Sequence, residues 1–161
     1  MHGRKESEVH SSERSAQEKF RIRAATIADS PQLASLAGQL GYASTPEQVA
    51  SRFRKISADR EHIILVAEDS HGALAGYIEV FPFRTIGADA RIEIASLVVD
   101  ESRRSQGVGR LLMEHAERWG RANGFAEAGL RSNVIRERAH TFYENLGYCV
   151  TKTQKSFRKK L

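Results

Sequence analysis

The stretch Arg104-Ser105-Gln106-Gly107-Val108-Gly109-Arg110 lies between an apolar segment and an amphipathic one, and it decides how the chain folds. Ahead of it, residues 92–99 are rich in Ile, Leu and Val and predict a β-strand. After it, apolar residues recur at helical spacing over residues 108–119 and predict a helix with one buried face. A glycine-rich turn between a strand and a helix leaves backbone N–H groups unpaired at the positive helix end. The stretch therefore predicts a site for a phosphate compound.

The spacing of the glycines excludes two common phosphate loops. A dinucleotide-binding fingerprint needs a third glycine three residues after Gly109, and Leu112 stands there. A P-loop continues from its second glycine with Lys and then Ser or Thr, but Gly109 is followed by Arg110 and Leu111. What remains is the pattern Arg-x-x-Gly-x-Gly, with two valines shortly before it.

A second motif lies toward the C-terminus, where residues 133–148 read Asn-Val-Ile-Arg-Glu-Arg-Ala-His-Thr-Phe-Tyr-Glu-Asn-Leu-Gly-Tyr. Together, in this order and at this separation, the two motifs resemble the GNAT superfamily of acyl-CoA-dependent N-acetyltransferases. The resemblance covers about residues 20–150. It implies that the loop holds the pyrophosphate of acetyl-CoA and that one strand pairs with the pantetheine arm through its backbone. The donor-binding residues that it implies are Leu97, Val98, Val99, Arg104, Ser105, Gln106, Gly107, Val108, Gly109, Arg110, Asn133 and Tyr143.

Length and composition fit one globular domain. The chain has 161 residues, of which 40% are hydrophobic and 28% charged. We expect a disordered tail over residues 1–19, which are polar and carry no signal-peptide pattern, and a single GNAT-like domain over residues 20–161. No apolar run approaches the roughly 18 residues of a membrane span, so we expect no membrane partner. The single cysteine fits a reducing, cytoplasmic location.

The net charge of +5 raises the question of nucleic acid. Coenzyme A is itself a polyanion, and arginines cluster around the loop that should bind it. The basic C-terminus, residues 152–160, lacks interleaved aromatic residues and any known nucleic-acid reader motif. We therefore expect a small-molecule amine substrate rather than nucleic acid. The resemblance also allows a homodimer.

The order of the elements predicts an α/β domain. Expected strands cover residues 20–24, 62–69, 73–83, 92–99, 126–132 and 148–156. Expected helices begin after Asp29, after Thr45 and at Val108, and a last one covers residues 135–146. With the resemblance, this gives a GNAT-like mixed central β-sheet of about six to seven strands flanked by about four helices. The first two helices would form one wall of the acceptor pocket, as the resemblance implies.

Acetyl transfer to an amine requires that the amine lose a proton. An amine with a pKa near 10.4 is neutral about once in 10³ at pH 7, a penalty of roughly 4–5 kcal/mol. Glu93 is the candidate base, because a charged residue in an apolar strand is costly to bury without a purpose. It matches the base position of one GNAT branch. The alternatives are that Glu93 faces solvent or pairs with Arg91 or Arg131, that Glu79 is the base, or that water takes the proton.

The leaving thiolate needs a proton donor. Tyr143 matches the family tyrosine that donates a proton to the coenzyme A sulfur; the alternative is a core aromatic residue on the helix face it shares with Phe142. Asn133 would bond the pantetheine amide, or would cap the following helix. Cys149 has no neighbouring His to activate it, so we expect a buried structural thiol. The six histidines show no metal-ligand spacing, and no metal is expected.

The sequence thus predicts an N-acetyltransferase that moves acetyl from acetyl-CoA to a primary amine of a small molecule by direct attack in a ternary complex. The region around His140 is similar to aminoalkylphosphonate acetyltransferases and to proteins labelled aminoglycoside acetyltransferases. Acceptors of those two types, a protein amine, and a coenzyme A-binding sensor without turnover all remain open.

Overall fold

The computed structural model describes residues 16–161; residues 1–15, most of the tail predicted over residues 1–19, lie outside the described part. Residues 16–19 are helical, and Ala16 is buried. The chain divides into two compact units, of which the first ends at Arg131 and the second is Ser132–Leu161. The single domain expected over residues 20–161 stays a prediction.

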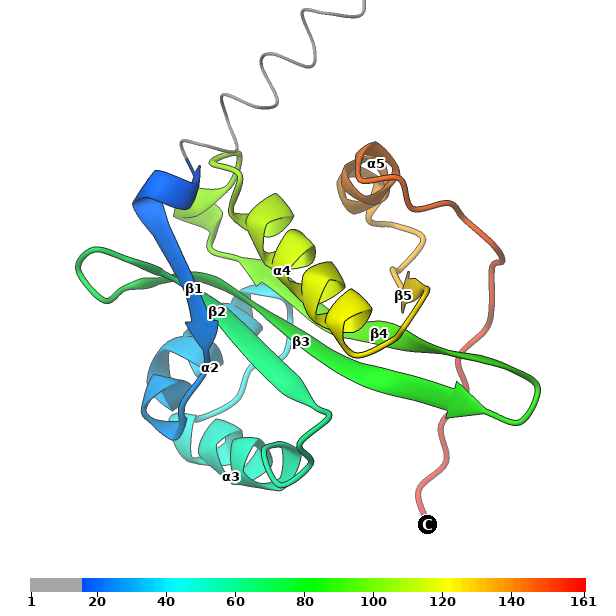
Figure 1. Cartoon of the computed structure of the whole chain (residues 1–161). Helices are drawn as coiled ribbons and strands as arrows, with labels where there is room; N and C mark the ends of the chain where they lie inside the picture. The colour runs from blue at the N-terminus through cyan, green and yellow to red at the C-terminus, as the bar shows by residue number, and fades with distance from the viewer. Residues whose placement is uncertain (1–15) are drawn as a thin grey trace, which may run out of the picture. The chain divides into compact units, whose positions relative to one another are not determined.

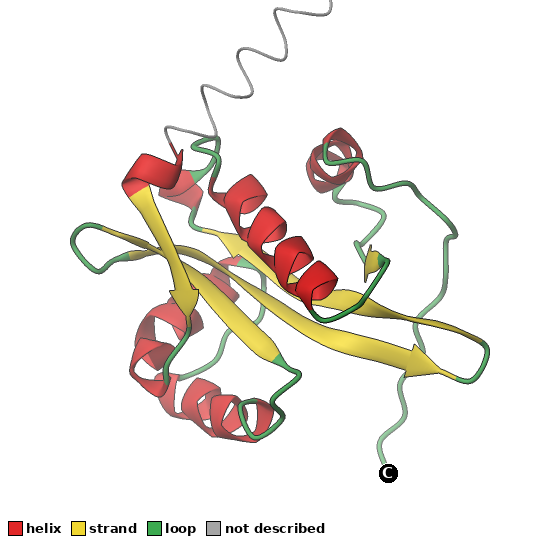
Figure 2. Cartoon of the chain, in the orientation of Figure 1, coloured by secondary structure: helices red, strands yellow, loops and turns green. Residues whose placement is uncertain are grey.

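The first unit is built on one five-stranded sheet (Figures 1 and 2). Its strands, in chain order and in spatial order, are β1 (Phe20–Ala24), β2 (Ile63–Asp69), β3 (Leu74–Thr85), β4 (Ala88–Val99) and β5 (Ala128–Leu130). Strands β1 to β4 pair antiparallel, and β5 runs parallel to β4. The expected mixed sheet is therefore present, with β3 and β4 as its long central hairpin.

Helices cover both faces of this sheet. Helix α4 (Val108–Ala122) lies on one face, and α2 (Ser30–Gln39) and α3 (Pro46–Ile56) lie on the other (Figure 1). Short 3-10 turns, η1 (Ile27–Asp29) and η2 (Glu101–Arg103), precede α2 and the glycine loop. The layers follow from the sequence, because each helix has an apolar stripe that the sheet must bury.

Helix α4 packs closely on the sheet. Its apolar stripe is buried and comprises Val108, Leu111, Leu112, Met113 and Ala116. Near its C-terminal end, a Cβ built on Gly120 would lie 2.9 Å from Cδ1 of Ile92 in β4. A close approach also occurs in β3, where a Cβ on Gly76 would overlap the carbonyl oxygen of Val98 and lie 3.3 Å from Cα of Val99.

The opposite face has its own core. Leu33 and Leu36 of α2 pack with buried side chains of β2, β3 and β4, and Tyr77 of β3 packs against this cluster. Helix α3 buries no residue fully but rests on the cluster through Val49 and Phe53. Helices α2 and α3 therefore cover this face of the sheet over parts of β2, β3 and β4.

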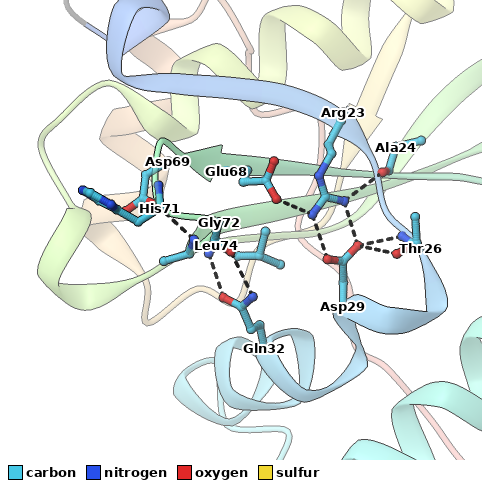
Figure 3. Close-up of polar contacts among 11 residues, drawn as sticks. Arg23, Ala24, Thr26, Asp29, Gln32, Glu68, Asp69, His71, Gly72 and Leu74 are labelled. Carbon is cyan, nitrogen blue, oxygen red and sulfur yellow. Dashed lines mark hydrogen bonds and ion pairs between the residues drawn. The ribbon is translucent and has the colours of Figure 1, made fainter.

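A network of charged groups fixes the start of α2 against the sheet (Figure 3). The guanidinium of Arg23 in β1 donates to both oxygens of Asp29, each at 2.8 Å, and to Glu68 of β2 at 2.7 Å. The backbone N–H of Thr26 also donates to Asp29, at 2.7 Å. The buried Asp29 carboxylate is thus fully satisfied, as burial of a charge requires.

The expected number of strands was wrong. Residues 148–156, expected as a sixth strand, form no strand, and the described part of the chain contains five strands rather than six or seven. Residues 150–161 are all exposed, and Val150 is 76% exposed. After Val150 the segment contains only Thr, Lys, Gln and Ser, which leaves too few apolar side chains to bury one face. Cys149 is consequently exposed and not buried as expected.

Candidate active site

Strand β4 changes its register halfway along its length. Ser96 pairs with Glu79 of β3, but Ile94 pairs with the next residue, Val80, so Ala95 is the extra residue of a β-bulge. Ala95 is exposed, although residues 92–94 just before it are buried. The bulge bends the strand at the centre of the sheet.

The neighbouring strand separates from β4 at the same place. Strand β5 pairs with β4 only at Ile92, Glu93 and Ile94. Within residues 16–161, the part of β4 after Ile94 therefore has a strand partner on the β3 side alone. Leu97 and Val99 lie on this open edge and are half-buried, whereas the Val98 side chain belongs to the core. An extended chain of another molecule has backbone groups to pair with here.

The segment after β4 is fixed by side chains of other elements. Gln39, at the end of α2, donates to Asp100 at 2.9 Å and accepts from the backbone N–H of Glu101 at 3.0 Å. Arg103 donates to Asp69 of β2 at 2.8 Å. All three hydrogen bonds precede the glycine loop, so the loop starts from an anchored turn.

The glycine loop enters α4 through two residues in the left-handed region. Ser105 has a φ of 62° and is the only residue other than glycine with a positive φ in the described range. Gly107, the N-cap of α4, has a φ of 82° and offers no side-chain cap. Gly107 therefore brings no side-chain cap to the first turn of α4, whose N–H groups have no partner within the helix by its geometry. They form the positive end of a 15-residue helix.

The predicted loop residues differ in what their side chains do. The Val108 side chain is buried, so only its backbone is available to a ligand. Gln106 donates to the carbonyl of Ser102 at 3.3 Å and closes the loop on itself. Arg104 lies 3.3 Å from Glu101 in an exposed pair, which is weak and readily exchanged for another anion. Arg110 lies in the first turn of α4 and is engaged in an interaction within the protein.

Glu93, the predicted base, lies in a buried ion-pair cluster. Only 2% of its side chain is exposed; one oxygen accepts from Arg131 at 2.9 Å, and the other accepts from Arg91 at 3.0 Å. Arg91 also stacks on Phe83, with its guanidinium carbon 4.4 Å from the ring centroid. This is the ion-pair arrangement that the sequence left open as an alternative. A role of Glu93 as a base stays a prediction.

Glu79, the alternative base, has different surroundings. One of its oxygens lies 2.8 Å from Nε2 of His62, and the other accepts from the hydroxyl of Ser96 at 3.2 Å. The side chains of His62 and Glu79 are 18% and 23% exposed. We call His62, Tyr77, Glu79 and Ser96 the β3 polar cluster.

Strand alternation places the β3 polar cluster on the α2–α3 face of the sheet. Tyr77 packs against the core of that face, and Glu79, two residues later, points to the same side. Burial raises the pKa of Tyr77, and its hydrogen bond with Ser96 opposes this rise. The tyrosine therefore keeps its proton near neutral pH. Sequence reasoning missed His62 and Tyr77, because only the pairing of β2, β3 and β4 brings them beside Glu79.

The second unit holds the remaining predicted residues. Tyr143 lies in α5 (Glu137–Asn145), where its ring meets those of Phe142 and Tyr148 at centroid distances of 5.3 and 6.2 Å. Burial raises the pKa of Tyr143, and the charge of Arg136 opposes the rise. The phenol is thus protonated at neutral pH.

Asn133 precedes α5 by several residues and does not act as the helix cap, which is Arg136. Its side-chain oxygen accepts from the backbone N–H of Ile135 at 3.2 Å and its carbonyl accepts from that of Arg136 at 3.0 Å. The residue therefore shapes the turn into α5. Its predicted bond to pantetheine stays a prediction.

Among residues 16–161, no group of three or more His, Cys, Asp or Glu side chains is arranged to hold a metal ion. In the same range, no helix has the length and apolar character needed to cross a membrane.

Comparison with known proteins identifies the family. A sequence model described as the acetyltransferase (GNAT) family matches residues 30–148. The chain belongs to this family. The match includes the glycine loop and the segment of Asn133 and Tyr143, so the predicted recognition is confirmed, and the chain is classed among the acetyltransferases.

Individual relatives agree with this GNAT assignment. The chain is 29% identical over 92 residues to an uncharacterized N-acetyltransferase, YhdJ, of Bacillus subtilis (strain 168), and the match covers 56% of this chain. It spans 65% of the length of that curated relative. A solved glucosamine-6-phosphate N-acetyltransferase of Arabidopsis thaliana is 26% identical with a TM-score of 0.74, covering 88% of this chain and 99% of that one.

A third similarity concerns the fold alone. A solved aminoglycoside N-acetyltransferase in complex with CoA is 18% identical to this chain, with a TM-score of 0.77. The comparison covers 88% of this chain and 95% of that one. The GNAT-like architecture expected from the sequence is therefore found in solved structures. The described residues contain five strands rather than six or seven and, counting the helical residues 16–19, five helices rather than about four.

Proposed function

We propose that this GNAT protein transfers an acetyl group from acetyl-CoA to a primary amine of a small molecule by direct attack in a ternary complex. The observation that carries the proposal is the open edge of β4 at Leu97–Val99, which is followed by the glycine loop and by the start of α4 at Gly107, an N-cap residue without a side chain. A donor that combines an extended amide-bearing arm with a diphosphate fits these two features together.

The diphosphate end of the donor would bind at the glycine loop, Arg104–Arg110. Backbone N–H groups at the start of α4 supply hydrogen bonds and the helix dipole favours negative charge. Arg104 is exposed beside Glu101 and is free to turn toward a phosphate, since such a surface pair contributes only about 0–1 kcal/mol. The two left-handed residues of the loop, Ser105 and Gly107, hold the backbone in the shape that presents these N–H groups.

The pantetheine arm would lie along Leu97–Val99 as an added strand. Its amides would pair with the β4 backbone where β5 has separated. The bulge at Ala95 ends this track. The acyl end of the donor would accordingly lie beside the bulge and close to Ser96.

The leaving sulfur would receive its proton from Tyr143. Burial raises the pKa of this phenol, so it is protonated at neutral pH and has a proton to give. A thiol has an ordinary pKa near 8.5, so the transfer requires little assistance. The amine must also lose a proton. The candidate acceptors are Glu93 and Glu79, which are both carboxylates on the α2–α3 side of the sheet. The contacts of Glu93 favour a structural role.

The acceptor is proposed as a small amine, and its type is a separate question. The Arabidopsis relative is named for glucosamine-6-phosphate, a small amine that also carries a phosphate. An aminoalkylphosphonate combines the same two groups, whereas an aminoglycoside is polycationic. A protein amine, and a sensor that binds coenzyme A without turnover, are the remaining alternatives.

The test is thiol release from acetyl-CoA by the full chain, with a panel of amino sugars, aminoglycosides, aminophosphonates and peptides. Binding of coenzyme A is measured in parallel by calorimetry. We expect saturable binding and amine-dependent thiol release with at least one small amine. Binding without release from any amine would indicate a sensor. Absence of binding at millimolar coenzyme A would overturn the proposal.

A further inference from the structure

We infer that Glu79 accepts the proton of the acceptor amine and that His62 positions the Glu79 carboxylate for this step. The inference rests on the proposed acetyl transfer and adds the site at which the amine binds. It assigns to the β3 polar cluster a role that neither the family match nor the relatives give it.

The geometry of Glu79 leaves it able to bind a further donor. A carboxylate has about four acceptor positions, and here one is occupied by His62 at 2.8 Å and one by Ser96 at 3.2 Å. Because a carboxylate only accepts, Nε2 of His62 carries the hydrogen of that bond. The carboxylate is held from two sides, and the 23% exposure of its side chain lets an ammonium group reach it.

The charges around the cluster favour a cationic amine. Tyr77 is a neutral hydroxyl on one side, and Tyr42 is near enough to influence it. On the opposite side the ring of His62 packs against Phe81, with centroids 5.3 Å apart. Glu79 is the single acidic group among these side chains, so an ammonium ion gains a charge-assisted hydrogen bond there.

Glu93 lacks this accessibility. Its carboxylate is 2% exposed, and both oxygens already accept from the guanidinium groups of Arg91 and Arg131. A substrate amine would have to displace an arginine to reach it. The two carboxylates lie on the same sheet face, since Glu93 pairs with Phe81, two residues beyond Glu79. They differ in access and in partners.

Glu79 lies beside the end of the proposed donor track on β4. Its cross-strand partner is Ser96, which adjoins Leu97 and the bulge residue Ala95. The proposed track for pantetheine ends at this point of β4. An amine held at Glu79 is therefore placed at the acyl end of the donor rather than at its phosphate end.

The ammonium transfers one proton to a Glu79 oxygen, and the freed nitrogen lone pair attacks the thioester carbonyl carbon. A C–N bond forms, the C–S bond breaks, and the sulfur takes the proton of Tyr143. The nitrogen, positively charged after the attack, releases its second proton to solvent, and solvent reprotonates Tyr143. The products are a neutral amide, the thiol of coenzyme A and one proton held on Glu79. His62, hydrogen-bonded to Glu79, fixes the orientation of the carboxylate.

The principal test is Glu79→Gln in the full chain, assayed by thiol release with the best amine from pH 6.5 to 9.5. We expect kcat/KM for the amine to fall about 10²- to 10³-fold at pH 7. The loss should shrink as the pH approaches the pKa of the amine, because a free amine needs no proton acceptor. The Kd for acetyl-CoA should stay within about twofold, since Glu79 lies outside the phosphate loop.

Three substitutions of His62 separate positioning from packing. His62→Gln keeps an N–H that can donate to Glu79, whereas His62→Ala removes both the hydrogen bond and the ring. His62→Phe keeps the ring against Phe81 and removes only the hydrogen bond. We expect Ala and Phe to lower kcat about 10-fold and Gln to retain more of it. Wild-type activity in the Phe variant would show that His62 only packs.

Glu61→Gln is the matched control, because Glu61 adjoins His62 but forms an exposed pair with Arg84. We expect its activity within about twofold of wild type. Full activity of Glu79→Gln, or a loss of equal size at every pH, would overturn the inference while leaving the acetyl transfer intact. If wild-type protein binds acetyl-CoA but acetylates no amine, both the proposed function and this inference fail.

Discussion

Ser105 and Gly107 show how single backbone angles shape the donor loop. Both lie in the left-handed region, at φ of 62° and 82°, but only Gly107 is a residue that adopts this region without strain. We expect Ser105→Gly to raise the free energy of unfolding by about 1 kcal/mol and Gly107→Ala to lower it by about as much. Urea unfolding of the two variants measures both changes.

The same pair also affects donor binding. Gly107→Ala changes the left-handed residue that precedes the first N–H groups of α4, so we expect weaker coenzyme A binding in calorimetry. Ser105→Gly loosens the loop but leaves its shape accessible, and its affinity should change less. Changes of stability in the same direction for both variants would contradict this account of the loop.

The proposed role of Tyr143 as proton donor can be tested by removing its hydroxyl. If its phenol protonates the leaving sulfur, Tyr143→Phe should lower kcat about 10- to 10³-fold, with little change in acetyl-CoA affinity. Thiol-release kinetics and calorimetry measure the two quantities. Tyr148→Phe is the matched control, because it removes a hydroxyl from the ring that contacts Tyr143. An unchanged rate in Tyr143→Phe would remove this residue from the mechanism.

Substitutions of two helical glycines, Gly38 and Gly120, should change the stability in opposite directions. A Cβ on Gly38 in α2 would meet nothing within 4 Å, whereas one on Gly120 in α4 would lie 2.9 Å from Cδ1 of the buried Ile92. Gly38→Ala should therefore stabilise the protein by about 0.5–1 kcal/mol through helix propensity. Gly120→Val should destabilise it by about 1–3 kcal/mol through overpacking.

Thermal and urea unfolding of both glycine variants measure the difference. Ile92→Val, which removes Cδ1, should reduce the cost of the change at Gly120, because the two residues share one contact. A Gly120→Val variant as stable as wild type would contradict the close packing of α4 against Ile92 of β4.

The elements differ in how far the sequence predicts them. Helix α4 begins at Val108 as expected, because the glycines and the apolar stripe are local signals. The bulge at Ala95 and the early end of β5 depend on pairing between distant strands, and no local residue marks them. The same holds for His62, which lies 17 residues from Glu79 and meets it only through the sheet.

The predicted strand over residues 148–156 shows the converse error. Its alternation of residue types resembles a strand, but strand formation also needs a partner and an apolar face.

Glu93 shows a similar limit of sequence-based prediction within the site. The sequence indicated that a buried Glu93 would need either ion-pair partners or a catalytic role, and it could not decide between the two. In the structure, Arg91 and Arg131 both form ion pairs with Glu93.

The stability of the whole molecule should depend on pH through Asp29. Hydrogen bonds from Arg23 hold the pKa of this carboxyl below its ordinary value; burial opposes the shift, and the Thr26 N–H adds to it. A carboxyl with a lowered pKa stabilises the fold above its unfolded value of about 3.9. That contribution is lost as the pH falls through the folded-state pKa.

We therefore expect the free energy of unfolding to decrease as the pH falls below about 5. In Asp29→Asn it should be lower at pH 7 and should depend less on pH in the acid range. Guanidinium titrations at pH 7 and below measure this. Asp89→Asn, at an exposed position of β4, is the control and should retain the wild-type dependence. An unchanged acid profile in Asp29→Asn would contradict the role of the Arg23 network.

The narrow gap between β3 and β4 at Gly76 restricts which sequences this fold accepts. Any side chain there would collide with main-chain atoms of Val98 and Val99, which no rotamer change moves aside. A library with all amino acids at this codon should, after selection for folded protein, return glycine almost alone. Homologues with the same backbone should have glycine at this position, whichever amine they acetylate.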